Sequence, residues 1–515
     1  QLPDRSPSTE VKGDKPNPLM ELATWKEPYR PQFHFTPPAK WMNDPNGMVY
    51  YDGEYHLFYQ HYPEGDVWGP MHWGHAVSED LVHWKHLPIG LEPDKLGMIF
   101  SGSAVVDWNN SAGFQTGDEK TLVAIFTHHL MEGEKAGRDD FQYQSLAYSN
   151  DRGRTWTKYS HNPVLDNPGI KDFRDPKVFW HEASNSWIMS LAVKDRIHFY
   201  RSNDLKEWTF ASEFGGNAGA HGGVWECPDL FPLPVDGDQA NQKWVLLVSI
   251  NPGGPNGGSA TQYFIGDFDG TTFTNDNDPS TTLWLDHGTD NYAGVTWSDL
   301  PENNQRRIFI GWMSNWDYAR DVPTKPWRSA MTIPRTLELK KTKQGVRLRA
   351  MPIDGLRRLR KETYGIRPQT LEEEIDLKAI NGIDDTAFEI HLEFEYSDDA
   401  YFGLIFKNAK NEKVEIAYVG TANEWIINRS KTSKSDFHEK FPAVHRAPNI
   451  QSGDTLKMTL YLDNSSVELF ANDGLVCMTD LFFSKEELRR LSLFKSAGNV
   501  RLVNGTVYTL KSIHR

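Results

Sequence analysis

Three carboxylic acids stand out because their neighbours are apolar or restrict the backbone. Asp44 lies in WMNDPNG (41–47), Asp175 in DFRDPKVFW (172–180) and Glu226 in GGVWECPDLF (222–231). Most of the 70 Asp and Glu residues are expected to be solvated surface groups. Each acid taken alone fits a turn or the start of a strand, since Asp-Pro is common in turns.

Together, the three acids fit one kind of chemistry. Cleavage of a glycosidic bond needs a nucleophile, a general acid and flat apolar faces for sugar rings. The chain has 18 Trp, and four of them stand in or near these motifs or a strand end, so we expect them near sugar: Trp41, Trp68, Trp225 and Trp312. Three others are expected to pack at strand starts: Trp84, Trp156 and Trp208.

A repeated turn indicates how the acids are brought together. SEDLVHW (78–84), SNDRGRTW (149–156) and SNDLKEW (202–208) share a Ser-x-Asp turn followed by Trp, and GDFDGTTF (266–273) is a weaker copy. Asp and its polar neighbours suit a tight turn, and the aromatic residue begins the next strand. The repeat predicts hairpin tips in successive similar units.

Five apolar runs separate these turns and were expected to be the inner strands of the units. They are YHLFYQ (55–60), TLVAIFT (121–127), SWIMSLAV (186–193), KWVLLVSI (243–250) and RRIFIGWM (306–313). Their spacing allows about four strands per unit, which predicts a five-bladed β-propeller. A stack of separate sandwiches is the alternative, but it does not explain one turn repeated at one edge. In a propeller, acids near successive inner strands converge on one funnel.

A second domain is predicted after the propeller. The basic, Leu-rich DGLRRLRKE (354–362) resembles a short helical linker, and alternating strands such as FEIHLEFEY (388–396) follow it. The sequence therefore predicts an all-β chain: an N-terminal extension (1–30), a catalytic propeller (31–352), a linker (353–366) and an accessory β-sandwich (367–515).

Composition excludes several function classes. The 515 residues carry a formal charge of −15, which disfavours binding to nucleic acid or an anionic membrane surface. No apolar stretch reaches the roughly 18 residues of a membrane span. The first residues, QLPDRSPSTE, lack a signal-peptide pattern and an initiator Met, so any signal is expected to have been removed. We expect a secreted, periplasmic or cell-surface protein, with a cytoplasmic location still open and the oligomeric state unknown.

The Cys and His residues do not indicate a second kind of catalytic site or a metal site. Cys227 stands beside Glu226 but has no obvious His partner, so a small buried residue is the better interpretation. The His residues around 72–86 and 128–129 lack the spacing of a metal site, and NDNDPST (275–281) is only half of a calcium loop. We therefore predict no metal and no cofactor.

Four motifs carry a resemblance to a known family. WMNDPNG, FSGS (100–103), FRDP (173–176) and WECPD (225–229), in this order, resemble the invertase, inulinase and levanase family of glycoside hydrolases. The similarity extends along nearly the whole chain, through GPMHWGHAVSEDLVHW (69–84), GFQTG (113–117), GWMSNW (311–316) and LDNSSVELFANDG (462–474). It implies a five-bladed catalytic propeller with an appended β-sandwich.

The resemblance also implies roles for individual residues. Asp44 matches the nucleophile, Glu226 the general acid and base, and Asp175 the acid that stabilises the transition state. Six further residues match the subsite for the terminal fructosyl unit: Asn43, Gln60, Trp68, Ser103, Arg174 and Trp312. The substrates implied are levan, inulin or sucrose, cleaved through a covalent fructosyl-enzyme intermediate.

These roles place physical demands on the site. Asp44 must be ionised, so amide donors such as Asn43 are expected to stabilise its charge. Glu226 must carry a proton, which Trp225 and a second carboxylate would favour. A retaining mechanism predicts that the two carboxyl groups lie about 5 to 5.5 Å apart, whereas inversion needs about 6.5 to 9.5 Å.

Several alternatives remain open at this stage. An exo-acting enzyme would release fructose, an endo-levanase would release oligosaccharides, and a fructosyltransferase would pass the same intermediate to a sugar. A non-catalytic fructan-binding protein is the alternative of another class, and three intact acids argue against it. Neither the preferred linkage nor sugar binding by the sandwich can be read from the residues.

Overall fold

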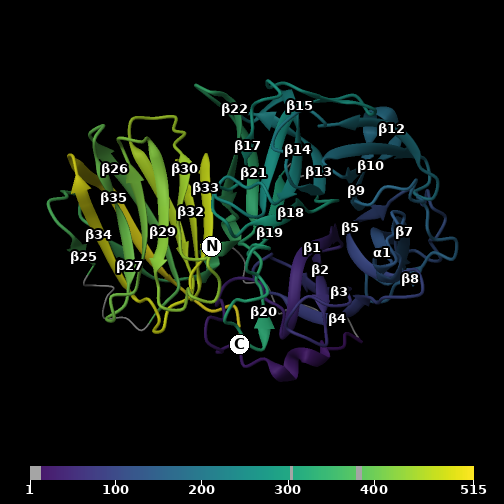
Figure 1. Cartoon of the computed structure of the whole chain (residues 1–515), viewed down its shortest axis with the longest axis horizontal. Coiled ribbons are helices and arrows are strands. Elements are labelled where there is room, and N and C mark those ends of the chain that lie inside the picture. Colours follow the sequence, from purple (N-terminus) through teal and green to yellow (C-terminus); the bar gives the residue numbers. More distant parts are fainter. Residues whose placement is uncertain (1–12, 302–305, 378–384, 515) are drawn as a thin grey trace.

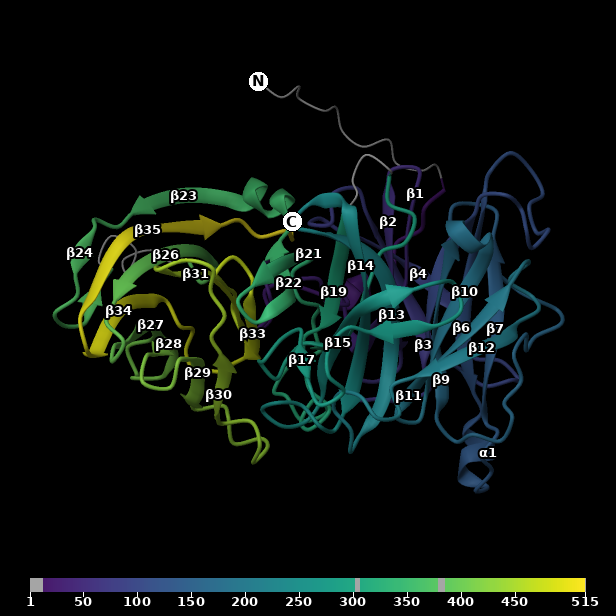
Figure 2. The same ribbon diagram turned by 90° about the horizontal axis from the view of Figure 1, so that it is seen from above.

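A computed structural model of the chain describes residues 13–301, 306–377 and 385–514. Figure 1 shows two bodies side by side, one formed by the purple-to-teal part of the chain and one by the green-to-yellow part. Figure 2 shows the same two bodies from above, and nearly all of their strands pair antiparallel. Helices in the described ranges are short: η1 (Pro18–Leu22), α1 (Met131–Lys135), η2 (Glu182–Ser184) and η4 (Asp354–Leu359). Within these ranges we find no helix with the length and apolarity needed to cross a bilayer.

The first body contains five units of four antiparallel strands. In chain order these are β1 (Lys40–Tyr51), β2 (Glu54–Tyr62), β3 (His72–Ser78) and β4 (Lys85–Leu91); β5 (Met98–Asp107), β6 (Thr121–His129), β7 (Gln142–Ser149) and β8 (Thr157–Lys158); β9 (Phe173–His181), β10 (Ser186–Val193), β11 (Arg196–Ser202) and β12 (Thr209–Phe214); β13 (Val224–Val235), β14 (Asp238–Asn251), β15 (Ala260–Phe268) and β16 (Phe273–Asn275); β18 (Tyr292–Thr296), β19 (Arg307–Trp312), β21 (Arg335–Thr342) and β22 (Gly345–Pro352). Short β17 (Leu283–Trp284) pairs with β15, and β20 (Trp327–Arg328) pairs in parallel with β1.

The first strands of the units meet around a common axis. β1 contacts β5, β5 contacts β9, β9 contacts β13, and β18 closes the ring against β13 and β1. The predicted five-bladed propeller is thereby confirmed. The expectation about its inner strands is wrong: the five apolar runs form β2, β6, β10, β14 and β19, each the second strand of its blade. The apolar runs within these strands are buried on both faces because the neighbouring blades cover them.

The repeated Ser-x-Asp turns join the third and fourth strands of their blades. Ser78 Oγ accepts from the Leu81 amide, and Asp80 Oδ1 accepts from the Val82 and His83 amides. Ser202 and Asp204 repeat this pattern with the amides of residues 205–207. Trp156 and Trp208 each donate from Nε1 to a carbonyl of the turn before them. The predicted hairpin tips are therefore confirmed, with side-chain oxygens satisfying the turn amides.

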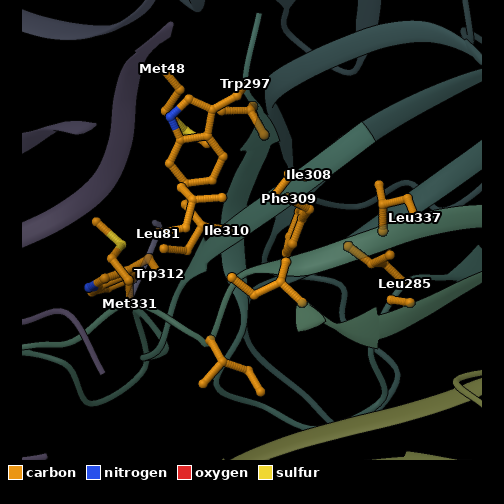
Figure 3. Close-up of a cluster of buried hydrophobic side chains, with 14 of the residues drawn as sticks. Met48, Leu81, Leu285, Trp297, Ile308, Phe309, Ile310, Trp312, Met331 and Leu337 are labelled. Carbon is orange, nitrogen blue, oxygen red and sulfur yellow. The ribbon is translucent and has the colours of Figure 1, made fainter. Parts of the chain in front are cut away.

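The apolar core of the propeller runs between adjacent blades. Figure 3 shows part of it, where Met48 and Leu81 of the first blade lie near Trp297, Ile308, Ile310 and Trp312 of the last. This contact joins the beginning and the end of the ring, so burial of these side chains holds it closed.

The second body is a sandwich of two antiparallel sheets around its own core. One sheet contains β23 (Arg360–Gly365), β24 (Gln369–Thr370), β35 (Val500–Leu510), β26 (Phe388–Tyr396), β31 (Leu456–Leu462), β32 (Ser466–Ala471) and β33 (Val476–Leu481). The other contains β25 (Ile375–Asp376), β34 (Arg490–Ala497), β27 (Tyr401–Lys407), β28 (Lys413–Val419), β29 (Glu424–Lys431) and β30 (Val444–Pro448). The helical part of the predicted linker is the short η4, and β23 pairs with β35, so sandwich structure begins within the predicted linker.

Buried ion pairs join the two bodies. Arg335 of β21 contacts Glu468 of β32 at 2.9 Å and Asp286, which precedes β18, at 3.1 Å. His34 lies between Glu468 and Asp463, and these two carboxylates raise the pKa of its imidazole to about 9. All five side chains are almost completely buried. Glu468 and Asp463 of the sandwich therefore meet their cationic partners, Arg335 and His34, only when the two bodies are docked.

Replacing Arg335 with Met should destabilise the protein strongly. The change leaves Glu468 and Asp286 without this cation in a buried site, which costs about 3–5 kcal/mol. Urea unfolding followed by fluorescence measures the loss. The matched control is Arg349→Met, which breaks an exposed pair with Glu338 and should cost less than about 1 kcal/mol. Equal losses in the two variants would contradict the importance of the buried network.

Candidate active site

Every first strand of the propeller is irregular at the same level. The register shifts fall between Met42 and Pro45, Ile99 and Gly102, Arg174 and Lys177, Glu226 and Asp229, and Tyr292 and Val295. At each shift, an interval of three residues on the first strand is paired with an interval of two residues on its neighbour. Such a bulge turns side chains away from the regular alternation of the strand. Five bulges around one axis therefore direct side chains into a common space.

Asp44 lies in the bulge of β1 and is only 7% exposed. Its Oδ2 accepts a hydrogen bond of 2.6 Å from Ser101 Oγ, and its Oδ1 accepts one of 3.1 Å from Asn43 Nδ2. Asn43 in turn accepts from Trp41 Nε1 at 2.8 Å, which fixes the orientation of its amide. The carboxylate is thus held in one orientation by groups from two blades.

Asp175 and Cys227 lie in the bulges of β9 and β13 and touch each other. Both residues have a positive φ, +69° and +48°, which is uncommon for residues other than glycine. Asp175 Oδ2 accepts from the Cys227 amide at 3.1 Å, and the Cys227 thiol lies 3.5 Å from both Asp175 Oδ2 and Asp44 Oδ2. The thiol therefore bridges the two carboxyl groups. Burial and these acids raise its pKa well above the usual value, so it is a poor nucleophile at neutral pH.

Glu226 receives hydrogen bonds on both of its oxygens. Tyr292 OH donates to Oε1 at 2.6 Å, and Arg174 Nη2 donates to Oε2 at 3.2 Å. Arg174 also contacts Asp172 at 2.8 Å. The guanidinium thus places positive charge among the acids, and the acids in turn raise its pKa.

These side chains surround a cavity of about 250 Å³. The three predicted acids line it, and so do four of the predicted binding residues: Asn43, Gln60, Trp68 and Arg174. Gln60 donates from Nε2 to Asn46 Oδ1 and to the carbonyl of Ile99, each at 2.9 Å. The remaining lining side chains are Phe100, Ser101, His129, Met131, Glu134, Phe141, Gln142, Lys171, Asp172 and Trp316.

Two predicted binding residues lie outside the lining of this cavity. Ser103 Oγ donates to the carbonyl of Pro176 and accepts from the Val178 amide, both at 3.0 Å, so it ties β5 to β9. Trp312 is fully buried and packs 4.8 Å from Trp316, between that ring and the core. Trp225 is also fully buried, against His221 and Phe264, rather than near the expected sugar. Trp41 is likewise buried, and its ring packs beside that of Trp316.

The sequence did not indicate the ten further residues that line the cavity, among them Ser101 and Trp316, nor Tyr292, which contacts Glu226. In the FSGS motif, Ser101 reaches the cavity and Ser103, two positions later, does not. In the GWMSNW motif, Trp316 reaches the cavity and Trp312, four positions earlier, does not. Tyr292 reaches Glu226 from β18, but NYAGV contains no acid or repeated motif that could have indicated it.

The pKa values of the acids reflect burial and mutual repulsion. Burial and the charge of Glu226 raise the pKa of Asp44 to about 6, although the bonds from Ser101 and Asn43 act in the opposite direction. Burial raises the pKa of Asp175 to about 7, with Arg174 opposing the shift and the other two acids adding to it. Asn43 stabilises the charge of Asp44 as expected, but the cost of burying that charge outweighs the hydrogen bonds. Asp44 is nevertheless mostly ionised at neutral pH.

The described parts of the chain contain no group of three or more His, Cys, Asp or Glu arranged to hold a metal ion. His128 instead contacts Asp94 and Ser145, and His129 contacts Glu134 and Gln142. In segment 275–281, Asp278 accepts from Ser280 within the turn. His128, His129 and Asp278 are thus engaged in local hydrogen bonds.

A propeller that gathers three carboxyl groups beside aromatic side chains around one cavity has the construction of a glycoside hydrolase. Comparison with known proteins identifies the family. Residues 34–352 match the glycosyl hydrolases family 32 N-terminal domain, and residues 355–509 match the family 32 C-terminal domain. The chain therefore belongs to glycosyl hydrolases family 32, and the resemblance drawn from the four motifs is confirmed.

Individual relatives agree with this assignment. The chain is 50% identical over 492 residues to a levanase of Bacillus subtilis, a match that covers 95% of this chain and 71% of the levanase. It is 38% identical to an extracellular exo-inulinase of Aspergillus awamori, with 95% and 96% covered. The crystal structure of exo-inulinase from Aspergillus awamori superimposes with a TM-score of 0.87 at 36% identity, covering 95% of this chain and 100% of that chain.

The Ser101→Ala variant should change the acid limb of the activity profile. A nucleophilic Asp44 must be ionised, so activity falls as the pH drops through its pKa of about 6. Loss of the Ser101 hydrogen bond removes a group that favours the ionised form, so the limb should move to higher pH. A bond to a charged group worth about 1.5 kcal/mol corresponds to about one pH unit.

Initial rates of substrate hydrolysis between pH 4 and 8 measure this shift. The matched control is Ser103→Ala, two residues along the same strand, whose hydroxyl bonds to the backbone of β9 instead. Its acid limb should stay within a few tenths of a unit of the wild-type position. A larger shift of the acid limb in the Ser103 variant than in the Ser101 variant would contradict the role of the Ser101 hydrogen bond in stabilising the ionised form of Asp44.

Proposed function

We propose that this protein hydrolyses β-fructosidic bonds of levan, inulin or sucrose with retention of configuration, and that it acts from the chain end to release fructose. The observation that carries the proposal is the convergence of Asp44, Asp175 and Glu226, from three different blades, on one cavity. Family membership and the levanase and exo-inulinase relatives support the fructan substrates.

The contacts of the acids support a double displacement. Asp44 attacks the anomeric carbon as a carboxylate and forms the fructosyl-enzyme, while Glu226 donates a proton to the leaving oxygen. Glu226 then removes a proton from the water that hydrolyses the intermediate. Asn43 and Ser101 hold Asp44 in place during attack, and Arg174 and Tyr292 hold Glu226.

Asp175 has a different environment, which fits a binding role. It is held by the Cys227 amide and lies next to Arg174, so its carboxylate is oriented by fixed groups rather than by solvent. A carboxylate in this position accepts hydrogen bonds from fructose hydroxyls and stabilises positive charge that develops on the ring. Aromatic faces on Trp68 and Trp316 supply apolar contact for the sugar.

The size of the cavity favours action at the chain end. At about 250 Å³ it is smaller than the roughly 300–1,000 Å³ typical of sites for drug-sized ligands, so it suits one terminal sugar unit. The exo-inulinase relatives agree with this interpretation, and the word extracellular in their names supports secretion of this protein. Endo-action, transfer to a sugar, and binding without catalysis are the outcomes that the following tests distinguish.

The variants Asp44→Ala and Glu226→Ala should each lose activity on levan and inulin by several orders of magnitude. The first removes the nucleophile and the second the proton donor, so both act on the chemical step. Melting temperature serves as the check on folding. The matched control is Asp267→Ala, an exposed acid paired with Lys243, which should retain wild-type rates. Undiminished hydrolysis by either active-site variant would refute the assigned roles.

Product analysis should give fructose alone from levan and inulin at the earliest times, whereas oligosaccharides would indicate endo-action. In water containing methanol, a retaining enzyme should form methyl β-fructofuranoside, because both displacements occur at the same carbon and invert it twice. Proton NMR of the first product distinguishes it from the α anomer. Formation of the α anomer would exclude the fructosyl-Asp44 intermediate, and binding of fructan without any product would support the non-catalytic alternative.

A further inference from the structure

The segment that leads into β18 is held by the sandwich. Residues 286–290 run along β33, where the amides of His287 and Asp290 donate to the carbonyls of Cys477 and Thr479 at 2.9 and 3.0 Å. In return, the Thr479 amide donates to Asp286 Oδ1 at 2.9 Å. A Cβ added to Gly288 would lie 2.2 Å from the carbonyl oxygen of Thr479, so the two backbones approach too closely for any side chain here.

Arg429 of β29 completes this attachment. Its Nη1 lies 2.7 Å from Asp290 Oδ2, and both side chains are 0% exposed. The guanidinium also donates to the carbonyls of Phe441 and Leu481 and to Tyr318 OH, at 2.6, 3.1 and 3.1 Å. Asp290 accepts a further bond of 2.8 Å from the Leu481 amide. A buried carboxylate held by so many donors from the sandwich has little freedom to move.

Tyr292 follows Asp290 by two residues and donates to Glu226 at 2.6 Å. The peptide between them is restrained as well, because Asn291 donates to Asp286 and the Ala293 amide donates to Ser249 Oγ. The position of the Tyr292 hydroxyl therefore depends on where Asp290 is fixed. A shift of this short segment by 1 Å would break the bond to Glu226.

We propose that Arg429 of the sandwich is a positioning residue for the reaction: through Asp290 it holds the Tyr292 hydroxyl on Glu226, so the sandwich completes the acid/base site. This inference rests on the role of Glu226 in the proposed function. It assigns the second domain a part in catalysis without any contact between that domain and substrate.

The test compares Arg429→Gln, Tyr292→Phe and the double variant with wild type on sucrose and on levan. Each single variant should lower kcat by about tenfold or more with KM changed less than about threefold. The two variants should lower kcat by a similar factor, because in both of them Glu226 loses the same hydrogen-bond donor. The Arg429 substitution should add less than twofold in the Tyr292→Phe background, since the two residues act through one contact.

Two further variants keep the test decisive if Arg429→Gln folds poorly. Arg429→Lys retains the charge beside Asp290 and should restore part of kcat. Leu404→Ala creates a cavity in the sandwich core and lowers stability, but should leave kcat and KM within about twofold of their wild-type values. Hydrogen exchange of the peptide 286–296 should rise in Arg429→Gln and not in Leu404→Ala.

The outcomes separate this inference from the proposed function. Wild-type protein that does not hydrolyse any of the fructosides contradicts the proposed function itself. Two results with active wild-type protein would overturn the positioning role alone. The effects of the Arg429 and Tyr292 substitutions on kcat could multiply independently, or Arg429→Gln could match Leu404→Ala in kcat, KM and hydrogen exchange.

Discussion

The burial of several carboxyl groups side by side governs the centre of this molecule. Asp44 and Asp175 are each about 95% buried, and burial, together with the charges of the neighbouring acids, raises their pKa values. Such a cluster is tolerated only where donors and cations are fixed around it. Ser101, Asn43, the Cys227 amide, Arg174 and Tyr292 are those groups, and they come from all five blades. The propeller supplies them because its first strands meet at one axis and are all bulged at one level.

The sandwich extends the same arrangement outward. Arg335 and Arg429 are buried cations at the interface, and their carboxylate partners in the propeller, Asp286 and Asp290, lie shortly before Tyr292 in the chain. The pairs Arg335–Glu468 and Arg429–Asp290 join the two bodies beside the last blade. An appended domain of this kind shapes the neighbouring site without lining it.

Much of the fold and part of the site could be predicted from the sequence. The Ser-x-Asp turns and alternating strands indicated a propeller and a sandwich because local turn chemistry and burial leave periodic patterns. Asp44, Asp175 and Glu226 could be found because their neighbours are apolar or restrict the backbone, and because the motifs that contain them occur together in one chain. Ser103 and Trp312 could not be distinguished from Ser101 and Trp316, because a bulge changes which residue of a motif faces inward. Tyr292 left no pattern, since its position depends on contacts made by residues almost 200 positions away.

The contact of His34 with Glu468 links residues 434 positions apart in the chain. During synthesis, the segment that leads into the first blade is made before the sandwich. His34 therefore cannot contact Glu468 and Asp463 until the sandwich has emerged from the ribosome. The segment before the first blade is therefore anchored only after both bodies have been made, although it precedes all five blades in the chain.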